Sequence, residues 1–148
     1  MAQILIVNLL FTINKTNMEI KRNDATRNRP EGDRVLDAPY VFANLPSFIE
    51  QVKDEKAWEK SDRNGITVFK TEGMTIVLSA LKEGAVIKDN VVNGFLTVHV
   101  LEGTIRLTTL EGDADMGDNQ LIVFHPGIPH SMEAMSDTVL LLTTYDVK

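Results

Sequence analysis

Apolar and polar residues alternate along the chain after residue 65, and this alternation predicts strands. Six segments rich in β-branched and aromatic residues lie between short turns, at 66–70, 74–81, 95–101, 104–110, 121–124 and 139–145. Strands that recur at intervals of roughly 8–15 residues are typical of an antiparallel sandwich or barrel. A parallel sheet would need crossover helices, and this half of the chain has no room for them. The pattern therefore predicts an all-β fold.

The chain before residue 65 has a different pattern, which predicts one helix. Four apolar side chains recur there at helical spacing: Leu45, Phe48, Ile49 and Val52. Pro46 suits the first turn of a helix, so we predict a helix over about 46–60. Asn64 and Gly65 should end it, because both residues tolerate the left-handed backbone of a helix cap. A short strand is predicted just before the helix, at 40–42.

The start of the chain carries one apolar run, at residues 4–13. The run is about half the length of a membrane-spanning helix, and no basic residue precedes it as in a secretory signal. Residues 1–17 are either an upstream extension, with translation starting at Met18, or an edge strand. We therefore expect a cytoplasmic protein without a membrane segment. Its expected parts are residues 1–17, an N-terminal segment at 18–64 and a barrel at 65–148.

Composition narrows the functional classes. The 148 residues fit one compact domain, and a formal net charge of −6 argues against nucleic acid as a partner. The absence of cysteine excludes disulfides, thiolate zinc sites and a cysteine nucleophile. The sequence has three histidines, so a metal site has few nitrogen ligands to draw on.

Two glycine-bounded segments resemble the motifs of the cupin family. The first cupin motif, G-x5-H-x-H-x3/4-E-x6-G, begins at Gly84 and closes at Gly103 with its spacing kept. The second motif, roughly G-x5-P-x-G-x2-H, matches at Gly127 and His130. The resemblance covers about residues 66–145. It implies a cupin-type jelly-roll barrel, also called a double-stranded β-helix, with one helix in front of it.

The same comparison implies a degenerate metal site. Cupin metal sites use three histidines and one carboxylate, and His130 is the ligand that this chain keeps. The other three ligand positions hold Asn90, Val92 and Leu96. A divalent cation held by one imidazole would keep most of its water and compete poorly with bulk solvent. No metal and no other cofactor is therefore expected.

Strand alternation gives a set of candidate pocket residues. It places Met132 and Ala134 on the inward face with His130, and it places His99 on the outer face. The candidates for a ligand pocket are His130, Asn90, Val92, Leu96, Val98 and Met132, with His125 at the rim. A mostly apolar lining with two polar groups is typical of a small-molecule pocket, but it is also typical of a closed core.

His130 and a group of acidic residues each have two interpretations. His130 either ends a turn, hydrogen-bonded to the backbone or to Asn90, or anchors a ligand as a group that binds anions or transfers protons. The acidic residues Glu111, Asp113, Asp115 and Asp118 bunch in one turn. They lack the spacing of a calcium-binding loop, so a solvated hairpin tip is the favoured interpretation.

Three functions follow from these features. The favoured one is a metal-free, cupin-like protein, either non-enzymatic or binding a small organic ligand in the barrel. The first alternative is an isomerase, epimerase or dioxygenase that uses His130, alone or with a metal recruited through His125. The second is a structural module in which a homodimer forms through residues 40–42, His99 and 139–142.

Overall fold

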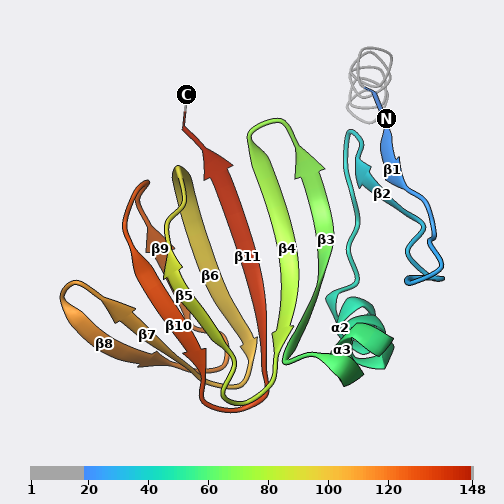
Figure 1. Ribbon diagram of the computed structural model, residues 1–148. Coiled ribbons are helices and arrows are strands. Elements are labelled where there is room, and N and C mark those ends of the chain that lie inside the picture. Colours follow the sequence, from blue (N-terminus) through green and yellow to red (C-terminus); the bar gives the residue numbers. More distant parts are fainter. Residues whose placement is uncertain (1–18, 148) are drawn as a thin grey trace, which may run out of the picture. The chain divides into compact units, whose positions relative to one another are not determined.

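The computed structural model describes residues 19–147 (Figure 1). Backbone contacts divide the chain after Ala43 into two units, and each unit is described by itself. The two interpretations of residues 1–17 lie outside the described residues. The expected limits of the N-terminal segment and the barrel remain predictions.

The described part of the first unit is a small hairpin. Strands β1 (Lys21–Asn23) and β2 (Arg34–Asp37) pair antiparallel, and Arg22 of β1 forms an exposed ion pair of 2.8 Å with Asp33, the residue before β2. The strand predicted at 40–42 is wrong, because these residues have no strand backbone. Pro39 has no N–H to donate to a ladder, which explains why the paired segment lies before it.

The second unit begins with two helices where the sequence predicted one. Helix α2 spans Leu45–Asp54 and helix α3 spans Lys56–Lys60, with Glu55 extended between them. The predicted stop near Asn64 is therefore misplaced, because strand β3 has already begun at that point. The Asn64 side-chain amide instead reaches across to α2 and donates to the carbonyl of Val52 at 2.8 Å. Within residues 19–147, no helix has the length and apolar character needed to cross a membrane.

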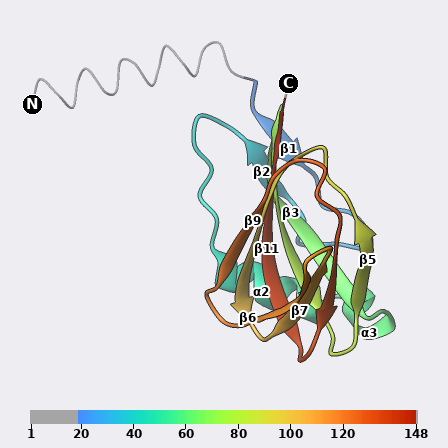
Figure 2. The same ribbon diagram turned by 90° about the vertical axis from the view of Figure 1, so that its left-hand side faces the viewer.

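Two antiparallel sheets face each other in the second unit (Figures 1 and 2). One sheet has the strand order β3-β4-β11-β6-β9 and the other has the order β5-β10-β7-β8. The strands are β3 (Arg63–Thr71), β4 (Met74–Leu81), β5 (Val86–Asn90), β6 (Gly94–Glu102), β7 (Ile105–Thr109), β8 (Gly112–Met116), β9 (Leu121–Phe124), β10 (His130–Ala134) and β11 (Thr138–Asp146). The all-β prediction is confirmed, and all six predicted strands are present.

The prediction did not include β5, β8 and β10 as strands. Strand β5 ends in charged and amide residues, and strand β8 is exposed except at its last residue. Both are edge strands, which form because a neighbouring strand offers a ladder rather than because their own residues favour extended backbone. Strand β10 is only five residues long, yet every second side chain along it is buried, at His130, Met132 and Ala134, as predicted.

The core fills the space between the two sheets. Residues of β6 alternate as predicted, with Leu96, Val98 and Val100 buried and His99 half-buried on the other face. The buried core residues are Leu81, Ala85, Leu96, Val98, Val100, Ile105, Leu107, Met116, Phe124, Met132, Ala134 and Leu140. The barrel interior is thus packed with apolar side chains.

Gly103 shows why a motif glycine is needed. Its φ of +93° lies in the left-handed region, and an added Cβ would sit 2.4 Å from the Asp137 carbonyl oxygen. A side chain here would meet both backbone strain and a steric clash. The β6–β7 turn therefore requires glycine.

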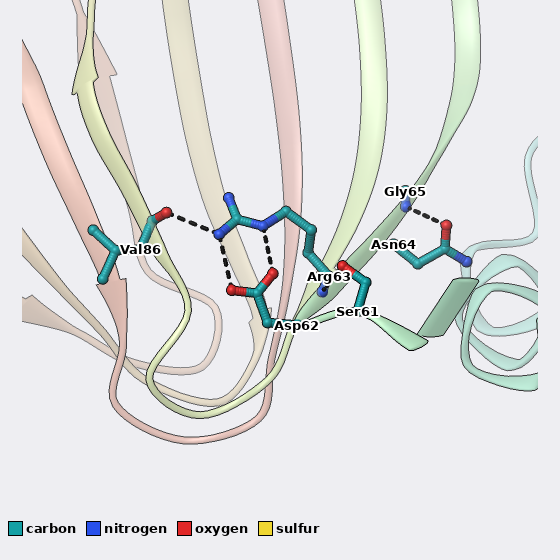
Figure 3. Close-up of polar contacts among 6 residues, drawn as sticks. All are labelled: Ser61, Asp62, Arg63, Asn64, Gly65 and Val86. Atoms are coloured by element: carbon teal, nitrogen blue, oxygen red, sulfur yellow. Dashed lines mark hydrogen bonds and ion pairs between the residues drawn. The ribbon is translucent and has the colours of Figure 1, made fainter. Parts of the chain in front are cut away.

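Arg63 connects the two sheets along one edge (Figure 3). Its Nη2 donates to the carbonyl of Val86 on β5 at 2.9 Å, while Asp62 accepts from its Nε at 2.8 Å and from its Nη2 at 3.1 Å. Hydrogen bonds from Arg63 hold the pKa of Asp62 below its ordinary value, and the carboxylate in turn raises the pKa of Arg63. This pairing holds the guanidinium in position to bridge β3 and β5.

Candidate functional site

His130 is the most constrained side chain among the site residues that the sequence predicted. It is the first residue of β10, and its side chain is buried, with 3% exposure. Its ring stacks on Phe124, with centroids 4.3 Å apart and planes 12° apart. Nδ1 lies 3.0 Å from the Ile128 carbonyl oxygen, and Nε2 lies 3.2 Å from Nδ2 of Asn90.

These two contacts assign the proton on the ring. A carbonyl oxygen can only accept a hydrogen bond, so Nδ1 of His130 must carry the hydrogen and donate to Ile128. In a neutral ring Nε2 is then unprotonated, and it accepts from the Asn90 amide. Both ring nitrogens are therefore engaged in hydrogen bonds inside the protein. Of the two sequence interpretations of His130, the turn-end histidine bonded to backbone and to Asn90 matches this geometry.

Asn90 faces His130 across the β5–β10 ladder, where the two residues are register partners. One N–H of its amide is used by His130, and its side chain is half-buried. Its Oδ1 has no hydrogen-bond partner among the described residues and is not one of their buried unpaired atoms. This acceptor at the His130 end of the barrel is thus unpaired within the described residues and is not fully buried.

Of the remaining predicted pocket residues, three lie in the core cluster and one packs against it. Leu96, Val98 and Met132 are packed in the core cluster, with exposures of 3%, 0% and 1%. Val92 packs against that cluster and is half-buried. Its carbonyl accepts from the Gly127 N–H at 2.8 Å, which ties the loop after β5 to the loop before β10. The role of these residues in a pocket remains a prediction.

The structure separates the other two histidines from His130. His125 is exposed, and its ring makes a T-shaped contact with the ring of Phe95 at a centroid distance of 5.0 Å. His99 lies on the opposite face of the sheet, opposite Leu121 and Leu141 in the ladder. Within residues 19–147, no hydrogen bond or ring contact joins either of them to His130.

Sequence reasoning missed two partners of His130. The sequence predicts Phe124 as the end of a strand, and strand alternation puts it on the inward face with Ile122. The Ile128 carbonyl carries no sequence signal, because every residue supplies one. Only the turn geometry brings this oxygen to the ring.

The donor set at His130 does not suit a divalent cation. The one imidazole has no free lone pair, the amide of Asn90 turns a donor toward it, and Val92 offers no ligand atom. In the described part of the chain, no group of three or more His, Asp or Glu side chains is placed to hold a metal ion.

The acidic residues near β8 make protein contacts. Asp115 accepts from Arg106 at 2.9 and 3.3 Å, and these bonds lower the pKa of Asp115. Asp118 accepts from the backbone N–H of Gly103 at 2.7 Å. The single hairpin tip that the sequence favoured is therefore wrong, because Asp113 and Asp115 lie within strand β8 and Asp118 lies in the loop after it. Pairing with β7 spreads these carboxylates along an edge strand.

Comparison with known proteins adds the fold family. No protein-family model matches the sequence, and no curated protein matches it significantly. Solved structures do match. The protein TT1209 from Thermus thermophilus is 24% identical with a TM-score of 0.59, over 72% of this chain and 98% of that chain.

Two further matches are named as cupins. A cupin superfamily protein from Desulfitobacterium hafniense is 13% identical with a TM-score of 0.56, over 57% of this chain and 78% of that one. An RmlC-like cupin from Shewanella frigidimarina is 11% identical with a TM-score of 0.55, over 59% of this chain and 78% of that one.

The topology defines a small antiparallel jelly-roll barrel with a packed apolar interior. These similarities identify it as a cupin fold, so the resemblance expected from the glycine spacing is confirmed. At such low identities the similarity establishes the fold and leaves the activity open.

Proposed function

We propose that this cupin-fold protein binds a small, uncharged organic ligand at the His130 end of the barrel without a metal and without catalysing a reaction. One observation carries the proposal: both ring nitrogens of His130 are engaged, one by the Ile128 carbonyl and one by the Asn90 amide. The position that a metal ligand would occupy therefore holds two side chains that are hydrogen-bonded to each other.

The chemistry of the exposed groups supports this class of ligand. Asn90 keeps an open carbonyl oxygen, which would accept from a ligand hydroxyl or amide N–H. The two loops tied together beside it carry exposed apolar side chains, Val91 at 54% and Ile128 at 44% exposure. A few polar groups in an apolar surround are typical of sites for small organic molecules.

The enzymatic alternatives have less support. Acid–base catalysis by His130 needs a ring nitrogen that can reach a substrate, and both are occupied. A metal recruited through His125 would need that exposed ring to turn from Phe95 toward His130. No contact among the described residues prepares such a pair.

Metal analysis tests the first half of the proposal. Protein purified without chelator should contain far less than one equivalent of any transition metal. A full equivalent in the wild-type protein that disappears in His130→Ala, but persists in the matched control His99→Ala, would overturn the metal-free assignment.

A thermal-shift panel tests the second half. A ligand present at about 100 times its Kd stabilises the native state by about 2.7 kcal/mol, which a melting curve resolves easily. Uncharged compounds with a hydroxyl or amide N–H should raise the melting temperature, and Asn90→Ala should abolish the rise while His125→Ala keeps it. Shifts produced only by metal ions or by anions would contradict the proposal.

We also propose that the protein forms a homodimer. β9 is the outermost strand of its sheet, and its outward side chains Leu121 and Val123 are 58% and 54% exposed. In the first unit, Tyr40 and Phe42 are also exposed, at 73% and 90%. Light scattering at micromolar concentration should give twice the chain mass, and Leu121→Ser with Val123→Ser should give the monomer. A wild-type monomer at that concentration would contradict the dimer.

A further inference from the structure

Strand β5 contains one residue more than its partner β10 across the same stretch of ladder. Asn90 is opposite His130 and Ile87 is opposite Met132, so two residues of β5, Lys88 and Asp89, face the single Ser131. This arrangement is a β-bulge, a feature that redirects the side chains beyond it and is frequent near functional sites.

The bulge decides which way Asn90 points. Ile87 packs against the core, whereas Lys88 and Asp89 are both exposed, so two successive side chains point outward. In a regular strand the direction alternates at every residue, and Asn90 would then share the outward side with Lys88. The extra outward residue turns Asn90 inward, to the imidazole of His130.

Asp89 carries the unusual backbone that makes the bulge. Its φ is +50°, and Asn119 is the one other non-glycine residue among those described with a positive φ. Aspartate and asparagine tolerate this left-handed region better than other residues with a side chain, and β-branched residues tolerate it worst. The backbone N–H of Asp89 donates to Ser131 Oγ at 3.0 Å, which supplies a partner that the interrupted ladder does not.

From this geometry we infer that Asp89 is a positioning residue: its left-handed backbone, anchored by Ser131, aims the Asn90 amide at His130. The bulge thereby determines which polar groups lie at the site. It brings the Asn90 amide nitrogen to His130 Nε2 and leaves Asn90 Oδ1 without a protein partner among the described residues. The inference rests on the proposed function for its biological meaning. The aiming of Asn90 is a property of the ligand-free protein and is tested there.

Nuclear magnetic resonance of the labelled, ligand-free full chain provides the test. In the wild-type protein, the side-chain amide protons of Asn90 should show a nuclear Overhauser contact with the His130 ring and slow exchange with water. Asp89→Gly should keep both signals, because glycine adopts a positive φ freely. Asp89→Val should lose both, because a β-branched residue favours the extended backbone that turns Asn90 outward.

A matched control separates aiming from general strain. Asn119→Val places the same unfavourable side chain at the other left-handed position, and the contact between Asn90 and His130 should persist there. Persistence of the contact in Asp89→Val, or its loss in Asp89→Gly, would overturn the inference.

Ser131→Ala provides a milder variant in case Asp89→Val does not fold. Loss of one hydrogen bond to the bulge should speed exchange of the bonded Asn90 amide proton about fivefold. An unchanged exchange rate would overturn the role of Ser131 as the anchor. Failure of the ligand panel with the contact intact would instead reject the proposed function and leave the positioning role standing.

Discussion

Replacing His130 with alanine tests the structure of the site most directly. The substitution removes a hydrogen bond to the Ile128 carbonyl, a hydrogen bond from Asn90 and a stacked contact with Phe124. Each hydrogen bond contributes about 1 kcal/mol net, and the ring pair adds about 0.5–1.5 kcal/mol. We expect His130→Ala to lower the free energy of unfolding by about 3 kcal/mol.

Urea unfolding followed by fluorescence or circular dichroism measures this loss. For a chain of this size, about 3 kcal/mol corresponds to a fall of roughly 10 °C in the melting temperature. The matched control is His125→Ala, because that ring is exposed and, among the described residues, has only its contact with Phe95 to lose, which is about 0.5–1.5 kcal/mol. A double-mutant cycle with Asn90→Ala should return a coupling energy of about 1 kcal/mol between the two side chains.

Two results would refute this reasoning. A loss below about 1 kcal/mol in His130→Ala would mean that the ring is not held by these three contacts. A fall in wild-type melting temperature on addition of a chelator would mean that a bound metal, rather than the amide of Asn90, stabilises the ring.

Three further substitutions test the scaffold. Asp62→Asn should destabilise the protein more at pH 7 than at pH 3. The folded pKa of Asp62 lies below its ordinary value of 3.8, so the stabilisation from its ion pair with Arg63 is complete above 3.8 and declines as the pH falls toward the folded pKa. Urea unfolding at pH 7 and pH 3 measures the difference. Gly103→Ala should cost about 3 kcal/mol by urea unfolding, because the added Cβ would lie 2.4 Å from a backbone oxygen at a left-handed position. Met132→Ala should cost about 2–5 kcal/mol by the same assay, because the side chain is 1% exposed in the core.

Each of these substitutions has a contrasting outcome. An equal effect of Asp62→Asn at both pH values would mean that the carboxylate does not act through its charge. Gly73→Ala is the control for Gly103→Ala, since Gly73 also has a positive φ, of +85°, but no atom within 4 Å of the added Cβ. Equal losses at the two glycines would exclude the clash as the cause. Full stability of Met132→Ala would mean that the barrel interior is loosely packed.

Much of the barrel could be read from residue patterns. Strands 74–81 and 121–124 have the predicted limits, because β-branched and other apolar residues that favour extended backbone fill both segments. The same alternation placed Met132 with His130 and turned His99 to the other side. Edge strand β8 was missed because its own residues carry almost no preference for extended backbone, and pairing with β7 forms it.

The helix prediction was wrong for a different reason. Apolar spacing predicted one helix that ended near Asn64, yet the chain extends at Glu55 and Asn64 bonds to α2 from a strand. Local residue preferences describe the neighbours of a residue along the chain. They do not describe a hydrogen bond between residues twelve positions apart.

The sequence by itself determined the period-two pattern, the turn glycines and the presence of Asn90, Val92 and Leu96 at the spacing where the cupin motif has ligands, because each depends on residue identity at a fixed spacing. Only the tertiary structure decided that Asn90 meets His130. An extra residue in β5 reverses the side to which Asn90 points, and such a bulge arises from the pairing of two strands rather than from either strand alone.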